Sequence, residues 1–327
     1  MASLVTVLVT GAAGFIGFHV AARLLATGTL AVGIDNMNSY YDVSLKQARL
    51  DKLTQLPGFV FRQLDVADRD AIHGLADEFP GITRIIHLAA QAGVRHSLID
   101  PYTYVTANVM GQVVMLELAR RLKGLEHFVY ASSSSVYGSN DVLPFAVDDR
   151  VERPCSVYAA TKRAGELIAA SYAHLYGVPA TGLRFFTVYG PWGRPDMAAF
   201  LFARAILAGE PICVFNYGEM WRDFTYIDDI VDGVIAAADR PPQTSPPHVI
   251  YNLGNHRPEK LTDFIATLEH ALGRKAELRL EPMQPGDVAR TYADIETSRR
   301  DLGFAPTTPI GIGLAKFVDW YRDYYSV

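Results

Sequence analysis

The chain has 327 residues, of which 50% are hydrophobic and 20% are charged, so it is long enough for a sizeable core and, we expect, two lobes. Its formal net charge of -5 gives no basic excess for nucleic acid or an anionic membrane, and no stretch approaches the roughly 20 apolar residues of a membrane-spanning helix. The two cysteines, Cys155 and Cys213, make no disulfide framework, which favours a reducing compartment and predicts a cytoplasmic protein.

Short apolar segments that end at glycine or aspartate alternate with helical segments over the first half of the chain. We expect strands at residues 4–10, 30–34, 59–64, 84–88, 127–132 and 180–186, and a helix at residues 15–26. The apolar start of the chain carries no basic segment and is interpreted as the first strand, not as a signal peptide. This alternation predicts an α/β fold with a Rossmann-like, doubly wound parallel sheet.

The pattern loosens after Gly190, where prolines divide the sequence into short pieces. We interpret this part as a smaller mixed lobe that covers the carboxyl ends of the strands. We expect residues 1–180 to form the nucleotide-binding domain with the reacting groups. Residues 181–327 are expected to form mainly the substrate-binding lobe, with some segments returning to the first domain. Asp228 and Asp229 are expected to cap a helix that begins at Ile230.

Three glycines separate the first predicted strand from the first predicted helix, in the sequence GAAGFIG at residues 11–17. Gly11, Gly14 and Gly17 permit a tight turn, a close approach of the backbone to a pyrophosphate, and close packing of helix on strand. The phosphates would rest on the amino end of the helix, at Phe15 and Ile16. In this context the glycines predict a dinucleotide site.

Asp35 ends the second predicted strand, about 20 residues after the glycines. Its carboxylate can accept hydrogen bonds from the adenosine ribose and would repel a 2′-phosphate, so we favour NAD over NADP; the alternative is that Asp35 only caps a loop. Asp65 either contacts the adenine or begins a turn, and the small residues after the fourth strand either flank the cofactor or only pack tightly. The other residues expected at the cofactor are Asn36, Val66, Leu88, Ala89 and Ala90.

Tyr158 and Lys162 lie four residues apart in a segment with good helical propensity, so they share one face of a helix. A phenol has a pKa near 10 in water, and a neighbouring ammonium favours its ionised form, so this pair is suited to act as a base. Serines fill residues 132–135 after the fifth predicted strand, where ligands bind in open sheets. Ser133 is expected to share the moving proton and the next two serines to hold other substrate oxygens; the alternative is a polar loop.

The glycine turn, the Tyr-x-x-x-Lys pair and the serine run together resemble the extended short-chain dehydrogenase/reductase family, in particular its nucleotide-sugar epimerases. The resemblance runs from about residue 4 to residue 325. Five passages narrow it to UDP-glucuronate 4-epimerases: residues 35–42, 89–95, 131–138, 184–197 and 222–230. It implies an isomerase that acts on a UDP-sugar with NAD as its cofactor.

The resemblance implies that Tyr158 takes the proton of the sugar 4-hydroxyl while a hydride passes to NAD. The 4-keto sugar then rotates and the hydride returns to its other face, so NAD stays tightly bound and is regenerated in each cycle. With UDP-glucuronate the intermediate is a β-keto acid, which readily loses carbon dioxide. Ser134, Ser135 and Thr187 are suited to hold the carboxylate with neutral donors. Relatives that dehydrate or decarboxylate tend to carry acidic residues at 134 and 135, and UDP-galactose epimerases usually have asparagine at 187.

Arginines are the candidates for binding the diphosphate, because a guanidinium binds phosphate through two parallel hydrogen bonds. Arg222 and Arg290 match positions that bind the diphosphate in relatives. Arg194 is expected to reach the diphosphate or the sugar carboxylate, and Arg95 to support them from the fourth strand; for each arginine the alternative is a solvated surface charge. Phe215 either stacks on the uracil or belongs to the core.

We interpret the chain as a UDP-glucuronate 4-epimerase, and three alternatives stay open. They are a UDP-glucose/UDP-galactose 4-epimerase, a UDP-glucuronate decarboxylase and a catalytically silent nucleotide-binding module. The histidines lack metal-ligand spacing, so no metal is expected. Helices near residues 102–121 and 156–176 form the dimer interface in relatives, which implies a homodimer, and no nucleic-acid or membrane partner is expected.

Overall fold

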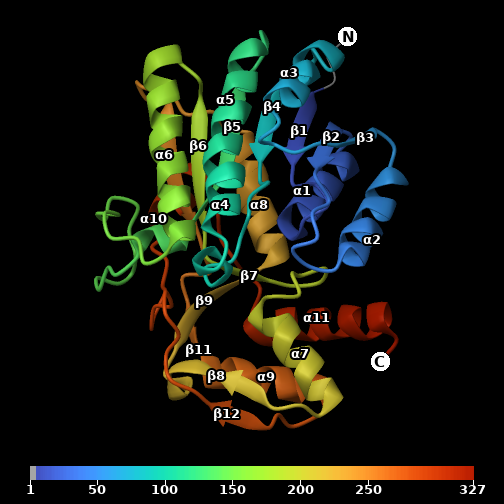
Figure 1. Cartoon of the computed structure of the whole chain (residues 1–327), viewed down its shortest axis with the longest axis vertical. Helices are drawn as coiled ribbons and strands as arrows, with labels where there is room; N and C mark the ends of the chain where they lie inside the picture. The colour runs from blue at the N-terminus through green and yellow to red at the C-terminus, as the bar shows by residue number, and fades with distance from the viewer. Residues whose placement is uncertain (1–4) are drawn as a thin grey trace.

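Seven parallel strands form the central sheet of the computed structural model, which describes residues 5–327 (Figure 1). Their order is β10-β6-β5-β4-β1-β2-β3. In chain order they are β1 (Thr6–Thr10), β2 (Leu30–Asp35), β3 (Phe59–Gln63), β4 (Ile82–His87), β5 (His127–Ser133), β6 (Ala180–Phe185) and β10 (His248–Leu253). The order reverses between β1 and β4, and ligands bind in the crevice at such a switch point. The predicted doubly wound sheet is confirmed; its first strand was expected from Leu4, which lies outside the described residues.

Helices cover both faces of this sheet, because each parallel connection must carry the chain across one face. On one face α3 (Arg69–Glu78), α5 (Gly111–Arg121) and α6 (Val157–Tyr176) pack against one another. On the other face α1 (Phe15–Ala26) packs between α2 (Val43–Thr54) and α8 (Ile227–Ala238). Short segments that precede α5 are α4 (Pro101–Tyr104) and the π-helical turn η2 (Val105–Met110).

The smaller lobe lies beyond the carboxyl ends of the strands, below the sheet in Figure 1. It contains a three-stranded mixed sheet in the order β11 (Pro258–Lys260), β9 (Trp221–Tyr226) and β7 (Thr187–Tyr189). A second pair of strands joins β8 (Ile212–Val214) to β12 (Leu278–Leu280). The helices of this part are α7 (Ala198–Ala208), α9 (Leu261–Leu272) and α11 (Ile310–Tyr325), whereas α10 (Glu296–Leu302) returns to the first lobe and packs on β10 and α8. The predicted smaller mixed lobe is therefore confirmed.

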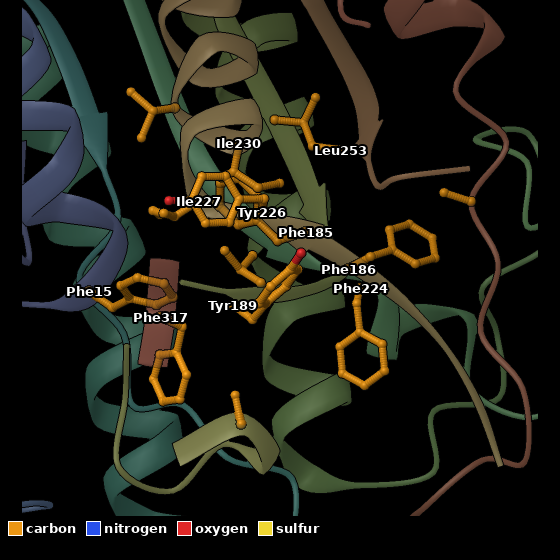
Figure 2. Close-up of a cluster of buried hydrophobic side chains, with 14 of the residues drawn as sticks. Phe15, Phe185, Phe186, Tyr189, Phe224, Tyr226, Ile227, Ile230, Leu253 and Phe317 are labelled. Carbon is orange, nitrogen blue, oxygen red and sulfur yellow. The ribbon is translucent and has the colours of Figure 1, made fainter. Parts of the chain in front are cut away.

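One hydrophobic core runs from the α1 and α8 face of the sheet into the smaller lobe (Figure 2). It includes Phe15 of α1, Ile230 of α8, Tyr189 of β7 and Phe317 of α11, all of them nearly or fully buried. Close packing of this kind resists deformation, so the two lobes are held together by a shared core. The crevice between them therefore has a fixed frame, and its adjustable parts are loops.

The helix α8 begins earlier than the sequence indicates, and its acidic residues have another role. We expected Asp228 and Asp229 to cap a helix from Ile230, but α8 begins at Ile227. The Asp229 carboxylate instead accepts hydrogen bonds from the backbone N–H groups of Thr307 and Thr308, both at 3.1 Å. It thus fastens the segment before α11 to the first lobe. Among all the helices of residues 5–327, none is long and apolar enough to cross a bilayer.

Candidate active site

A cavity of about 770 Å³ opens where the carboxyl ends of the sheet strands meet the smaller lobe. This volume is typical of a small-molecule site. The cavity brings together every residue that we predicted for cofactor or substrate except Arg290. Arg290 is exposed, and its guanidinium lies 6.0 Å from the centre of the Trp221 ring. The structure therefore does not bring Arg290 to the site, and its role stays a prediction.

The glycine turn packs its backbone closely against neighbouring backbone at the amino end of α1. Gly11 has a φ of +69°, and a Cβ atom there would lie 2.9 Å from the backbone nitrogen of Ala89. A Cβ atom on Gly17 would lie 2.1 Å from the carbonyl oxygen of Gly11. Gly14, Phe15 and Ile16 line the cavity at this helix end, so its N–H groups are available to an anion. These features fit the pyrophosphate of a dinucleotide.

Asp35 lines the cavity and also holds the glycine turn in place, so both of its predicted roles are compatible with the structure. Its carboxylate accepts hydrogen bonds from the N–H groups of Ala13 and Met37, at 3.2 and 2.9 Å. The Nζ atom of Lys46 lies 4.0 Å away and donates at 2.8 Å to the backbone of Asn38. Lys46 is a cavity residue that sequence reasoning missed.

Asp65 lines this end of the cavity and also begins a turn, so both of its predicted roles are compatible with the structure. Its carboxylate accepts hydrogen bonds from the N–H of Ala67 and from the side chain of Asn36, both at 2.8 Å. Val66, Leu88, Ala89 and Ala90 complete the wall. The wall is thus mostly apolar, with carboxylates at one end.

Tyr158 and Lys162 stand on the first turns of α6, where Ser156 caps the helix by accepting the N–H of Ala159 at 3.1 Å. The Nζ atom of Lys162 donates to the carbonyl oxygen of Ala131 at 2.8 Å and lies 6.0 Å from the centre of the Tyr158 ring. Burial lowers the pKa of Lys162 to about 8, and the charge of Glu166 opposes that fall. Lys162 is therefore a buried amine whose pKa lies much nearer to neutral pH than the usual lysine value.

The Tyr158 hydroxyl does not have the lowered pKa that we expected from Lys162. Burial raises the pKa of Tyr158, while a hydrogen bond from Ser133 and the charge of Arg194 oppose the rise. The physical reason is burial, and Lys162 does not offset it because its ammonium donates to the Ala131 carbonyl oxygen. Ser133 itself accepts hydrogen bonds from the N–H and the hydroxyl of Ser135, at 3.2 and 2.9 Å.

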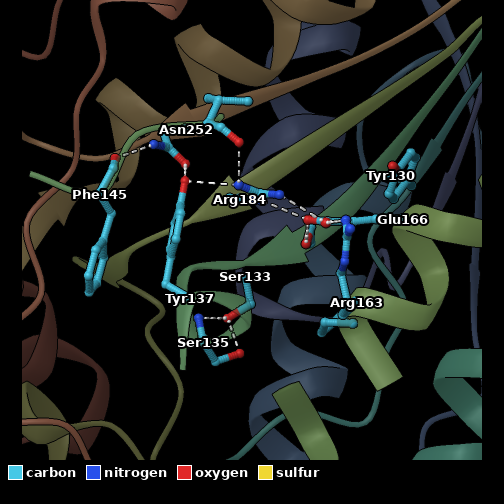
Figure 3. A network of polar contacts seen from close by, with 12 residues as sticks. Tyr130, Ser133, Ser135, Tyr137, Phe145, Arg163, Glu166, Arg184 and Asn252 are labelled. Carbon is cyan, nitrogen blue, oxygen red and sulfur yellow. Dashed lines mark hydrogen bonds and ion pairs between the residues drawn. The ribbon is translucent and has the colours of Figure 1, made fainter. Parts of the chain in front are cut away.

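A buried ion pair supports these reacting groups from below (Figure 3). Glu166 follows Lys162 by one helical turn, and its carboxylate receives two hydrogen bonds from Arg184, at 2.8 and 3.0 Å. The same carboxylate accepts the hydroxyl of Ser132 at 2.6 Å. Arg184 also donates to the hydroxyl of Tyr137 at 3.0 Å. The network ties the end of β5 to α6, which fixes Ser133 relative to Tyr158.

Cationic and aromatic side chains gather at the opposite end of the cavity. Arg95 forms an ion pair with Asp287 at 2.8 Å, and its guanidinium lies 4.3 Å from the centre of the Phe215 ring. Arg222 donates to the carbonyl oxygens of Trp221 and Ala289, at 2.9 and 3.2 Å. Arg95 thus covers one face of Phe215, so a uracil would have only the other face available.

The substrate end also contains Ser134 and Ser135 of the segment η3 (Ser134–Tyr137), and Thr187 at the start of β7. Arg194 lines the cavity from the loop that precedes α7 and pairs with Asp196 at 3.0 Å. Sequence reasoning gave no role to four residues in or beside this site whose partners are remote in the chain: Tyr40, Arg49, Glu166 and Asp287. It also missed Lys46 and Asp196, whose partners Asn38 and Arg194 are close in the chain. Tyr40 and Asp196 do lie within the passages that carry the family resemblance, which was the available signal.

Together these residues provide a cradle for a dinucleotide, a tyrosine and a serine able to move a proton, and donors and cations for an anionic substrate. The tyrosine and serine lie on the same cavity as the glycine turn. That arrangement suits removal of a proton from an alcohol whose carbon gives up a hydride.

The model of the NAD dependent epimerase/dehydratase family matches residues 7–254 of the chain. An uncharacterised 37.6 kDa protein from the cld 5′ region of Escherichia coli O111:H- is 51% identical, over 98% of this chain and 99% of that protein. A probable UDP-glucuronate 4-epimerase of Rhizobium meliloti (strain 1021) is 47% identical, over 97% of each chain.

The crystal structure of the UDP-glucuronic acid 4-epimerase of Bacillus cereus in complex with UDP-glucuronic acid and NAD is similar with a TM-score of 0.90. It is 34% identical in sequence, over 98% of this chain and 100% of that chain. The predicted cofactor is confirmed, since the matched family depends on NAD. The predicted resemblance is confirmed as well, and the chain belongs to the NAD dependent epimerase/dehydratase family.

Proposed function

We propose that the protein interconverts UDP-glucuronate and UDP-galacturonate by NAD-dependent epimerisation at carbon 4 of the sugar. The observation that carries this proposal is the common cavity of Ser133, Tyr158 and Lys162 with the glycine turn. The similarity to relatives named UDP-glucuronate 4-epimerases supports it over nearly the whole chain.

The glycine turn and Asp35 hold NAD, which when bound accepts a hydride from the sugar and returns it. Tyr158 in its ionised form takes the proton of the 4-hydroxyl and becomes a neutral phenol, and Ser133 donates a hydrogen bond that stabilises the phenolate before the transfer. Because burial raises the pKa of Tyr158, the side chain is a neutral phenol in the protein alone, and additional positive charge at the site is needed to form the phenolate that accepts the proton. Lys162 supplies part of that charge when its ammonium turns from the Ala131 carbonyl.

Ser134, Ser135 and Thr187 hold the sugar carboxylate with neutral hydroxyl donors. All three line the cavity. Directed hydrogen bonds fix the orientation of the carboxylate, so that its bond to the sugar ring does not align with the π-system of the neighbouring ketone. This misalignment prevents loss of carbon dioxide. Positions 134 and 135 carry no acidic residue, and this argues against a dehydratase or a decarboxylase.

The direct test incubates the purified protein with UDP-glucuronate and identifies the product by NMR and mass spectrometry. We expect UDP-galacturonate without any added reductant, and a lower catalytic efficiency with UDP-glucose. No epimer, or mainly pentose-containing product, would reject the proposal. Tyr158→Phe should lower kcat by about 10² to 10⁴-fold and still retain NAD, so an active variant would remove Tyr158 as the base.

We also propose a homodimer that pairs through α6 and the helices around η2. Large apolar side chains are exposed there: Ile99 and Tyr102 are 79% and 82% exposed, and Leu167 and Leu175 of α6 are more than half exposed. Such a patch marks an interaction surface. Sedimentation at micromolar concentration should give a dimer, and Leu167→Glu a monomer; a monomeric wild type would contradict this. The free Cys155 and Cys213 support a reducing, cytoplasmic setting.

A further inference from the structure

Arg194 is a cavity residue whose guanidinium is held in one orientation by a neighbouring carboxylate. The side chain is 21% exposed. Its Nε atom donates to Asp196 Oδ1 at 3.0 Å, and its Nη2 atom donates to Oδ2 of the same residue. Two parallel bonds fix the plane of a guanidinium, and Nη1 takes no part in them. Arg194 and Tyr158 line the same cavity, so this cation belongs to the site of the reacting groups.

Tyr40 holds Asp196 from the opposite lobe. Its hydroxyl donates to Asp196 Oδ2 at 3.1 Å. The tip of the ring lies against the backbone after β4, because a Cβ atom on Gly93 would be 2.5 Å from the Tyr40 oxygen. Tyr40 belongs to the loop after β2 that begins with Asp35, the residue expected at the adenosine ribose. A chain of contacts therefore joins the cofactor loop to Arg194.

A second connection joins the same two segments beneath the first. Arg49 of α2 is fully buried. It donates to the carbonyl oxygen of Ala13 in the glycine turn at 2.9 Å, and to the carbonyl oxygens of Trp192 and Gly193 at 2.7 and 3.1 Å. A buried cation is tolerated only where such acceptors satisfy it, so this position is strongly specified. The loop that carries Arg194 is thus fixed to the cofactor side of the cavity by two connections, one through Tyr40 and one through Arg49.

Building on the proposed epimerisation of UDP-glucuronate, we propose that Tyr40 and Asp196 are positioning residues that hold Arg194 at the sugar carboxylate and so suppress decarboxylation. In that side reaction of the 4-keto acid, the carbon–carbon bond to the carboxylate breaks. Its electron pair passes into the enolate of the ketone as carbon dioxide leaves. A cation held at the carboxylate stabilises the negative charge before it moves, which raises the barrier to this loss.

The test compares Tyr40→Phe and Asp196→Asn with the wild type by the ratio of pentose-containing product to UDP-galacturonate. Tyr40→Phe keeps the ring against Gly93 and removes one hydrogen bond, so we expect the ratio to rise about fivefold. Asp196→Asn removes the charged partner of Arg194, and we expect about tenfold. Tyr172→Phe is the matched control, because it removes a similar tyrosine–carboxylate bond, to Glu117 at 2.7 Å, outside the cavity.

A second measurement needs no turnover and uses Tyr158→Phe as the background. Adding Tyr40→Phe should weaken binding of UDP-glucuronate about fivefold in calorimetry and leave binding of UDP-glucose unchanged. Equal ratios in all variants, or an equal loss for both ligands, would overturn the inference. If the wild type gives no UDP-galacturonate, the proposed function fails, and the binding measurement still decides this inference. Tyr40→Phe decides alone where Asp196→Asn fails to fold.

Discussion

The two ends of the cavity are built differently. The reacting groups Ser133, Tyr158 and Lys162 stand on β5 and α6, which are fastened together by the buried pair of Glu166 and Arg184. The substrate end takes some of its residues from loops, such as Arg194 and Asp287, and its ion pairs are partly exposed: Arg95 is 50% exposed in its pair with Asp287. Regular elements with buried partners hold a geometry to a fraction of an ångström, whereas loops accept changes of sequence.

This difference separates the chemistry of the site from its selectivity. Moving a proton and a hydride requires fixed distances, which β5, α6 and the glycine turn supply. Choosing one sugar over another requires contacts that differ between relatives, and Thr187 and Arg194 lie on the segments between the lobes. The shared core beneath holds the frame independently of these contacts. Measurements of the unfolding free energy can therefore test whether contacts at the reacting end contribute more to stability than contacts at the substrate end.

The largest effect is expected for Arg184→Met. This change leaves Glu166 as a buried carboxylate without its two-bond partner, and breaking a buried pair costs about 3 to 5 kcal/mol of unfolding free energy. The matched control is Arg163→Met, since Arg163 donates to the same carboxylate at 2.8 Å but is 30% exposed. Its loss should cost less than about 1 kcal/mol. Urea unfolding of both variants checks this, and equal losses would contradict a rigid reacting end.

A smaller and pH-dependent effect is expected for Lys162→Met. The pKa of Lys162 is about 8 in the folded protein against 10.5 in an unfolded chain, so between these values the unfolded state binds more protons. The cost of burying Lys162 is therefore full below pH 8 and disappears as the pH rises to 10.5. The variant lacks this cost. The unfolding free energy of the variant should therefore exceed that of the wild type by the largest margin at pH 7. At pH 10.5 this margin should be smaller by roughly 3 kcal/mol.

Urea unfolding of wild type and variant at several pH values between 7 and 10.5 measures this difference. Other groups titrate in the same range, but they are common to both proteins and cancel in the comparison. A difference that stays constant with pH would mean that Lys162 keeps an ordinary pKa. The reacting end would then be more open to water than its burial indicates.

The sequence predicts which side chains meet at the reacting end because its signals are local. The glycines are adjacent in the chain, Tyr158 and Lys162 are one helical turn apart, and the serines close a strand. The six predicted strands were found within two residues at each end that the structure describes, because a buried parallel strand is an apolar run with a clear stop. β10 was not predicted as a strand, since its outer half is only partly buried and it follows a proline-rich segment.

The supporting residues escape prediction because their partners are distant in sequence. Arg49 looks like an ordinary charge on a surface helix, yet one of its partners, Trp192, is 143 residues away. The partner of Glu166 is Arg184 on β6, 18 residues further along the chain, so the supporting role of Glu166 follows only from the fold. Arg290 shows the opposite case: an arginine predicted at the diphosphate that is exposed and does not line the cavity. Spacing along the chain predicts neighbours on one element, and only the fold determines neighbours across elements.

The smallest effect is expected for Asp287→Asn, at the substrate end of the cavity. Its pair with the half-exposed Arg95 should contribute less than about 1 kcal/mol to stability. The Asp287 charge also acts on Arg222, so the carboxylate competes with a diphosphate for both cations. We expect the variant to bind UDP a few-fold more tightly in calorimetry, with the gain shrinking at high salt because the charges are partly exposed. A large loss of stability would instead mean that the pair of Asp287 and Arg95 stabilises the substrate end as strongly as the pair of Glu166 and Arg184 stabilises the reacting end. Selectivity would then have to be changed by remodelling the frame itself.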